Sequence, residues 1–258
     1  MTETFADGRL ILSPGRIARL TLNAPASKNA ISRAMWTALP VIADRLAADP
    51  ATRVLVITGA GGAFSAGADI SEFEETYATP ERAAATNAIV RAGQQSIRDL
   101  PIPVIAMIEG ACVGGGCGLA LSCDLRFAAE TAFFAITPAR LGIAYSAADT
   151  WALMEKVGTA KAKDILFSAR RLPASEALSI GLIDRVRPSA DLPTDTEGYA
   201  SQIAELSPAS HRVTKATVNA LSRVPDAPAL SAAFEALFTG QDFAEGRAAF
   251  LAKRKPAF

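Results

Sequence analysis

The spacing of apolar residues predicts a hairpin and then a helix near the start of the chain. Two β-like stretches cover residues 9–12 and 16–22, and Ser13-Pro14-Gly15 between them predicts the turn of a hairpin. Ser32 precedes a helical stretch that extends to residue 48, and its hydroxyl is placed to cap that helix. The apolar residues that recur at helical spacing are Met35, Leu39, Ile42 and Leu46.

Two continuous apolar runs, residues 54–58 and 103–108, predict strands that are buried on both faces. Each run is followed by a glycine-rich loop, residues 59–70 and 110–118, and Thr79 opens a helix between them that extends to about residue 100. Further short strands are expected at residues 125–128 and 132–136. The remainder of the chain is helical almost throughout. This order of elements predicts an α/β fold with a helical C-terminal third.

Composition and charge narrow the class of protein. The chain has 258 residues, half of them hydrophobic, which suffices for one large domain, alone or with a smaller appendage. The formal net charge is zero, so we expect neither nucleic acid nor a membrane surface as a partner. No run reaches the about 18 apolar residues of a membrane span, and the N-terminus lacks the apolar segment of a signal peptide. Cys112, Cys117 and Cys123 form no C-x-x-C pair, which indicates reduced thiols in a cytoplasmic protein and no metal site.

The two glycine-rich loops are the candidate site, because each follows a buried strand and leads towards a helix. Ligands of α/β sheets gather at the carboxyl ends of strands, and glycines there free backbone amides to point at an anion. Two amides that converge on one oxygen form an oxyanion hole, in which each donor contributes about 3–4 kcal/mol to a transition state. The alternative is that these glycines only permit tight turns.

Better-known motifs do not fit these loops. Gly62 and Gly67 have the outer spacing of a P-loop, but Ala68-Asp69 stands where the lysine and hydroxyl residue would bind phosphate and magnesium. The second loop does not complete the G-x-G-x-x-G pattern. Ser65 is not in a nucleophile elbow, and the single histidine, His211, lies in a late helix, which excludes a Ser-His triad of the usual kind.

The loops do resemble a known family. Phe64-Ser65-Ala66-Gly67-Ala68-Asp69-Ile70 and Gly110-Ala111-Cys112-Val113-Gly114-Gly115-Gly116-Cys117 resemble the two signature loops of the crotonase (enoyl-CoA hydratase/isomerase) superfamily. The resemblance continues through residues 123–128, 141–142, 177–183 and 245–254, in the order and spacing of the family. It therefore covers nearly the whole chain.

The resemblance implies a spiral core of ββα units at residues 1–195 and a helical C-terminal oligomerisation region at residues 196–258. It further implies homotrimers, often paired into hexamers, and an acyl-CoA substrate. The amides of Ala68 and Gly115 would form the oxyanion hole. We therefore expect an enoyl-CoA hydratase/isomerase-like enzyme that stabilises a thioester enolate.

Coenzyme A would be present as part of the substrate, with no permanently bound cofactor. By resemblance, Lys28 approaches the coenzyme A phosphates, and Ala66, Asp69 and Ile70 line the adenine pocket, where Asp69 also braces the loop. Phe250 and Lys253 would reach a coenzyme A bound by a neighbouring subunit. The alternative for both lysines is an ordinary solvated side chain.

The sequence departs from the family where hydratases carry two glutamates, because Gly118 and Pro138 stand at those positions. Neither residue can transfer a proton, whereas decarboxylation of a β-carboxyl thioester generates its enolate without a base. The segment that ends at Tyr145 resembles methylmalonyl-CoA decarboxylase, and Tyr145 would orient a carboxylate or deliver a proton. Asp149 is expected to stabilise the dipole of its helix rather than to face the site.

Two other classes of function stay open. One is a catalytically silent acyl-CoA-binding protein that kept the fold and lost the acids. The other is an RNA-binding relative, which the neutral charge does not favour.

Overall fold

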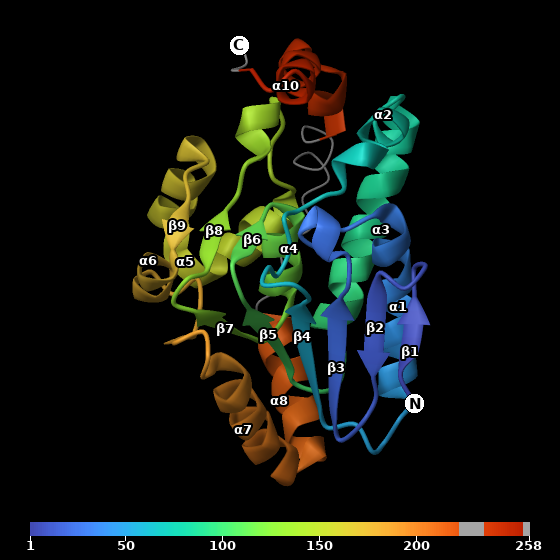
Figure 1. Ribbon diagram of the computed structural model, residues 1–258, viewed down its shortest axis with the longest axis vertical. Coiled ribbons are helices and arrows are strands. Elements are labelled where there is room, and N and C mark those ends of the chain that lie inside the picture. The colour runs from blue at the N-terminus through green and yellow to red at the C-terminus, as the bar shows by residue number, and fades with distance from the viewer. Residues whose placement is uncertain (222–234, 255–258) are drawn as a thin grey trace.

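A seven-stranded sheet forms the centre of the computed structural model, which describes residues 1–221 and 235–254 (Figure 1). The strand order is β1-β2-β3-β4-β5-β7-β10. Strands β1 to β3 are antiparallel neighbours, and every pairing from β3 onward is parallel. The strands are β1 (Glu3–Phe5), β2 (Leu10–Ser13), β3 (Ile17–Leu22), β4 (Val54–Gly59), β5 (Val104–Ile108), β7 (Leu125–Ala129) and β10 (Arg185–Arg187).

A smaller sheet lies beside the first and has the order β6-β8-β9. Its strands are β6 (Ala111–Val113), β8 (Phe133–Ala135) and β9 (Leu172–Pro173). Strand β6 pairs parallel with β8, and β8 pairs antiparallel with β9. Because β6 follows β5 directly along the chain, the small sheet fixes the second glycine-rich loop.

The helices cover both faces of the central sheet (Figure 1). They are α1 (Arg33–Ala47), α2 (Phe73–Thr76), α3 (Pro80–Arg98), α4 (Gly115–Ser122), α5 (Ala147–Ser168), α6 (Ala174–Ser179), α7 (Leu192–Glu205), α8 (Pro208–Leu221) and α10 (Gln241–Leu251). Short 3-10 helices are η1 (Pro25–Ser27), η2 (Ile70–Glu72), η3 (Pro138–Leu141) and η4 (Leu237–Thr239). Across the described residues, we find no helix whose length and apolar content would let it span a bilayer.

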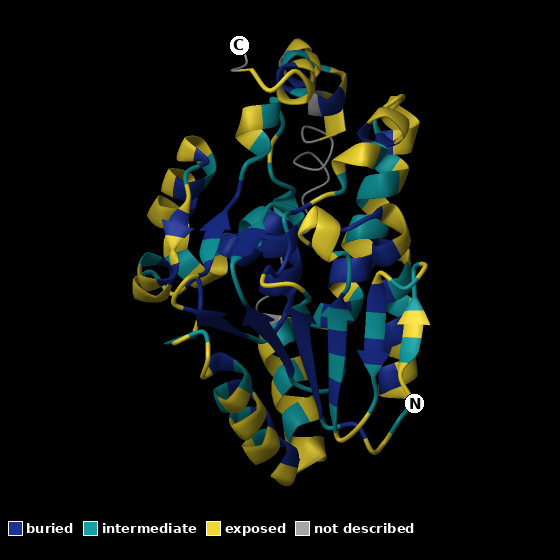
Figure 2. Ribbon diagram, viewed as in Figure 1, coloured by how far each residue is buried: buried dark blue, intermediate teal, exposed yellow. Residues whose placement is uncertain are grey.

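Successive residues of the central strands enter two different cores. Leu55 and Ile57 belong to the larger core, which includes residues of α1, α3, α4 and α5. Val54 and Val56 face the opposite side and pack with Ala200 of α7. Figure 2 shows the central strands as the most buried part of the fold. Burial on both faces, which the continuous apolar runs predicted, is confirmed.

The local predictions for the first half of the chain are also confirmed. The hairpin pairs Leu10 with Leu22 in an antiparallel register. The Ser32 hydroxyl accepts a hydrogen bond from the amide of Met35 at 3.3 Å, and the Thr79 hydroxyl accepts one from Arg82 at 3.3 Å. Both hydroxyls therefore cap the helices that they were expected to open.

Two features differ from the prediction, and the domain division is not tested. The loop expected at residues 110–118 contains strand β6, and α4 already begins at Gly115. The two- and three-residue strands β9 and β10 interrupt the C-terminal part that was expected to be almost entirely helical, because such short strands carry no periodic signal. Residue 195 falls inside α7, and the division into a core and an oligomerisation region stays a prediction.

Asn29 clamps the first glycine-rich loop to the segment that precedes α1. Its side chain is fully buried, and its carbonyl oxygen accepts a hydrogen bond from the amide of Ala24 at 2.8 Å. Its amide nitrogen donates to the carbonyl oxygens of Ala60 and Ala63, each at 2.7 Å. The backbone of Asn29 is left-handed, with φ 56°, which asparagine tolerates better than most residues. This one side chain therefore fixes the start of the loop that leads to Ala68.

We expect Asn29→Ala to lower the free energy of unfolding by about 3 kcal/mol, because the three hydrogen bonds of this buried side chain are lost at about 1 kcal/mol each. Asn23→Ala is the matched control, since the Asn23 side chain donates one hydrogen bond, to the carbonyl of Gly8, and should cost about 1 kcal/mol. Urea unfolding of the three proteins measures both values. Equal losses in the two variants would contradict the role of Asn29 as a clamp.

Candidate active site

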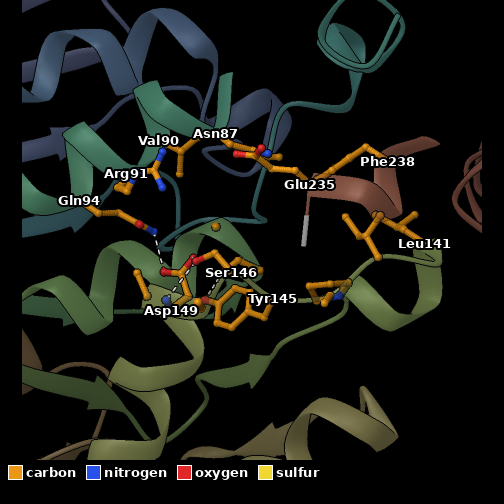
Figure 3. A pocket seen from close by; sticks show the side chains of 18 of the residues that line it. Asn87, Val90, Arg91, Gln94, Leu141, Tyr145, Ser146, Asp149, Glu235 and Phe238 are labelled. Atoms are coloured by element: carbon orange, nitrogen blue, oxygen red, sulfur yellow. Dashed lines mark hydrogen bonds between the residues drawn. The ribbon is translucent and has the colours of Figure 1, made fainter. Parts of the chain in front are cut away.

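A cavity of about 480 Å³ opens where the two glycine-rich loops meet α3 and the start of α5 (Figure 3). The loops contribute Ala68, Gly114 and Gly115 to its wall. Further lining residues come from α1, α2, α3, α5, the segment after β8 and the region near η4. Those used below are Trp36, Phe73, Tyr77, Gln94, Tyr145, Ser146, Asp149, Glu235 and Phe238. The structure thus brings both predicted loops and Tyr145 to one cavity.

The amides of Ala68 and Gly115 lie close together at the cavity wall. A β-carbon placed on Gly115 would lie 3.8 Å from the Ala68 nitrogen. The bridge between Ala68 and Ile31 uses the carbonyl of Gly67 and the amide of Asp69, so the Ala68 N–H points away from it. Gly115 is the first residue of α4, where helix N–H groups have no partner inside the helix. The two amides therefore lie near each other at the cavity wall.

Only glycine allows the loops to approach so closely. Gly67 has φ 105°, and a β-carbon on it would lie 3.1 Å from the carbonyl oxygen of Val113. A β-carbon on Gly116 would lie 2.7 Å from that of Ser65. Gly67 and Gly116 therefore allow the backbones of the two loops to lie in close contact, and their role is not limited to turns.

Tyr145 lies beside these amides. Its hydroxyl donates a hydrogen bond to the carbonyl oxygen of Gly114 at 3.1 Å. Burial raises the pKa of the phenol well above its usual range, and the nearby charge of Asp149 raises it further. Tyr145 is therefore a neutral phenol at neutral pH.

Asp149 is the site residue that the sequence analysis placed wrongly. It lies in the first turn of α5, as expected, but its side chain is buried and lines the cavity. Gln94 donates a hydrogen bond to Oδ1 at 2.9 Å, and the Ser146 hydroxyl donates to Oδ2 at 2.6 Å (Figure 3). Ser146 also caps α5 by accepting from the Asp149 amide at 3.0 Å. The spacing Ser-x-x-Asp, which is close to a capping box, is the signal that would have indicated this pairing.

The environment of Asp149 perturbs its acidity. Burial raises the pKa of its carboxyl group, while the hydrogen bonds from Ser146 and Gln94 and the charge of Arg98 lower it; the net shift is upward. Among the described residues, no ion pair involves Asp149. A buried carboxyl group that faces a cavity and has a shifted pKa is typical of functional sites.

Aromatic rings form the outer wall of the cavity. Tyr77 stacks on Phe238 with ring centroids 4.8 Å apart, and it forms a T-shaped pair with Phe73 with ring centroids 5.2 Å apart. Burial raises the pKa of Tyr77 to about 12, so this ring stays uncharged. The outer wall therefore suits an apolar group.

The residues predicted to bind coenzyme A lie outside the described cavity lining. The backbone of Lys28 lies in the left-handed region, with φ 50°. Its carbonyl oxygen accepts a hydrogen bond from the Ala66 amide at 2.8 Å, so the segment before α1 adjoins the first glycine-rich loop. Asp69 accepts hydrogen bonds from the amide and hydroxyl of Ser71 and from Arg9, which fits the expected bracing of the loop. Ile70 is 47% exposed.

The C-terminal residues Phe250 and Lys253 lie at and just after the end of α10. Phe250 is 46% exposed. Their contact with a neighbouring subunit stays a prediction, as do the roles of Lys28, Ala66, Asp69 and Ile70.

Comparison with known proteins gives a consistent family match. Residues 13–258 match the sequence profile of the enoyl-CoA hydratase/isomerase family. The protein named "Probable enoyl-CoA hydratase echA8" of Mycobacterium bovis is 34% identical over 247 residues, which are 94% of this chain and 94% of that protein.

Solved structures share the fold. An enoyl-CoA hydratase/isomerase family protein from Hyphomonas neptunium is similar with a TM-score of 0.81 at 41% identity, over 97% of each chain. Methylmalonyl-CoA decarboxylase in complex with 2-nitronate-propionyl-CoA is similar with a TM-score of 0.87 at 27% identity, over 97% of this chain and 98% of that one. These structures confirm the predicted crotonase-like α/β fold.

We expect Asp149→Asn to change how stability depends on pH. The pKa of the Asp149 carboxyl group is higher in the folded protein than in the unfolded chain. The resulting contribution to the free energy of unfolding is fully present below the unfolded-state pKa, where the group is protonated in both states. It is lost as pH rises through the folded-state pKa. Relative to the variant, the wild type should lose stability as pH rises, and at neutral pH the variant should be at least as stable. Urea unfolding of both proteins from about pH 4.5 to about pH 8 measures this difference. A difference that is independent of pH would contradict the raised pKa.

Proposed function

The chain belongs to the enoyl-CoA hydratase/isomerase family, and we propose that it turns over an acyl-CoA thioester whose enolate is held by the amides of Ala68 and Gly115. The observation that carries this proposal is the meeting of these two amides at the wall of one cavity. A thioester carbonyl oxygen bound there accepts both hydrogen bonds.

The site favours the enolate over the ground-state thioester. Negative charge develops on the carbonyl oxygen when the enolate forms, and preorganised amides stabilise that charge more than they stabilise the neutral carbonyl. Gly115 is also the first residue of α4, and the start of a helix adds partial positive charge. The acyl group extends from the amides into the cavity, along Trp36 and towards the aromatic wall at Tyr77 and Phe238.

Coenzyme A occupies the surface next to the first loop in this proposal. Ala66 and Lys28 adjoin there through a backbone hydrogen bond, and the Lys28 ammonium group would meet the phosphates. Asp69 and Ile70 would flank the adenine. Phe250 and Lys253 would serve the site of a neighbouring subunit.

Gly115→Pro tests the oxyanion hole. Proline removes one amide donor, yet it is tolerated at the first position of a helix, so we expect a fall in turnover of roughly 100- to 1,000-fold with retained folding. Gly115→Ala is the control, because it keeps the amide and its β-carbon would meet only ordinary contacts, such as 3.6 Å to Trp36. Mass spectrometry of a panel of crotonyl-CoA, a 3-enoyl-CoA and methylmalonyl-CoA measures turnover. Equal activity in the two variants would exclude a role for the Gly115 amide.

A second candidate function is decarboxylation of a β-carboxyl acyl-CoA. Similarity to methylmalonyl-CoA decarboxylase and the neutral phenol of Tyr145 beside the amides support it. Loss of carbon dioxide breaks the carbon–carbon bond and leaves its electron pair in the enolate, which the two amides hold until a proton arrives. Asp149 weighs against this candidate, because an ionised carboxylate in the same cavity repels the carboxylate of the substrate.

The second candidate predicts carbon dioxide release from methylmalonyl-CoA, slowed at least about tenfold in Tyr145→Phe if the phenol orients the carboxylate or delivers the proton. Carbon dioxide release and propionyl-CoA formation are measured together. Conversion of a 3-enoyl-CoA or of crotonyl-CoA without any carbon dioxide release would exclude decarboxylation.

A further inference from the structure

Gly118 leaves a space in α4 that groups from two other helices fill. A β-carbon on Gly118 would lie 2.4 Å from Nε2 of Gln94, 2.9 Å from Oδ1 of Asp149 and 3.3 Å from the hydroxyl of Tyr145. The position that lacks a side chain is therefore occupied by the Gln94 amide from α3 and the Asp149 carboxyl group from α5.

This point lies close to the two amides. The amide of Gly118 donates to the carbonyl of Gly114 at 3.1 Å, so Gly118 sits one helical turn from Gly115. Residues three or four apart on a helix are separated by about 5–6 Å, which is the reach needed to contact the α-carbon of a thioester whose oxygen lies at the amides. Asp149 thus stands where a proton on that carbon would be removed.

A structural role does not account for the carboxyl group. The Ser146 hydroxyl already caps α5. An asparagine at this position would accept the hydrogen bond from Gln94 at its carbonyl oxygen and donate from its amide to the Ser146 hydroxyl oxygen, without a buried charge. Burial of a carboxylate without a cationic partner is unfavourable. The Tyr145 hydroxyl is committed to the carbonyl of Gly114, and Glu235 is an exposed residue of the cavity wall.

We propose that Asp149 is the catalytic base of this site and that the reaction is a proton shift along the acyl chain of an enoyl-CoA. The Asp149 carboxylate takes a proton from the α-carbon, the C–H electron pair moves into the enolate held at Ala68 and Gly115, and the same proton returns at the γ-carbon. The double bond moves from the 3- to the 2-position, the carboxylate is regenerated, and no further reactant is needed. Gln94 and Ser146 are positioning residues, because each holds one carboxylate oxygen.

This inference rests on the proposed function, and exchange in heavy water separates the two. Butyryl-CoA has α-protons but no double bond, so its deuteration measured by mass spectrometry reports enolate formation alone. We expect wild type to exchange, Asp149→Asn to exchange at least about 100-fold more slowly, and butyryl-CoA affinity by calorimetry to stay unchanged. Glu130→Gln, which alters an exposed carboxyl group outside the cavity lining, should exchange like wild type.

A second variant tests the same arrangement by steric displacement and leaves the charges unchanged. Gly118→Ala keeps α4 helical, but its β-carbon would displace Gln94 and Asp149, so exchange should fall at least about tenfold. The same two variants should lose conversion of 3-hexenoyl-CoA to 2-hexenoyl-CoA.

The outcomes are distinct. If Asp149→Asn binds butyryl-CoA and exchanges at the wild-type rate, Asp149 is not the base and the proposed function stands. If wild type binds butyryl-CoA but does not exchange its α-protons, the inference is also overturned. If wild type does not bind butyryl-CoA, the proposed function falls and the inference falls with it.

Discussion

The contact between the two glycine-rich loops is the constraint on which the site depends. Ser65 and Cys112 form a β-bridge, and a β-carbon on Gly110 would lie 2.2 Å from the carbonyl oxygen of Gly62. Any larger residue would separate the loops, and with them the amides of Ala68 and Gly115. The parallel strands β4 and β5 set this contact, because neighbouring parallel strands deliver the loops that follow them to the same edge of the sheet.

The side chains of the site come from elements other than the two glycine-rich loops. Ser146 caps α5, the cap places Asp149 in the first turn, and Gln94 of α3 completes the network around the carboxyl group. Tyr145 links the same segment to the carbonyl of Gly114. The amides and the carboxyl group therefore come from different elements, held together by hydrogen bonds across the cavity.

The sequence indicated where a backbone site would lie but not which acid faces it. The glycine patterns after the buried strands are local signals for the two loops, and the resemblance to the crotonase superfamily implied Ala68 and Gly115 as the amides. The direction of the Asp149 side chain depends on how α5 packs against α3, and no local pattern reports a helix–helix contact. Gly118 was interpreted as the loss of an acid, whereas the structure shows that the missing side chain leaves room for Asp149. Strands β9 and β10 escaped prediction because their pairing is set by distant partners, Phe134 for Leu172 and Phe127 for Arg185.

The two parts of the site differ in how they tolerate substitution. An oxyanion hole made of backbone amides survives most side-chain changes, provided that the glycines at the contact remain and no proline removes an N–H. A catalytic base has a different requirement, because its carboxyl group has to lie at one position in the cavity. Any helix or loop that reaches this position can carry that carboxyl group. Asp149 of α5 reaches the point beside Gly118 because Gly118 has no side chain of its own. Under the proposed function, the backbone therefore fixes the enolate chemistry, while the proposed base comes from α5 and not from α4.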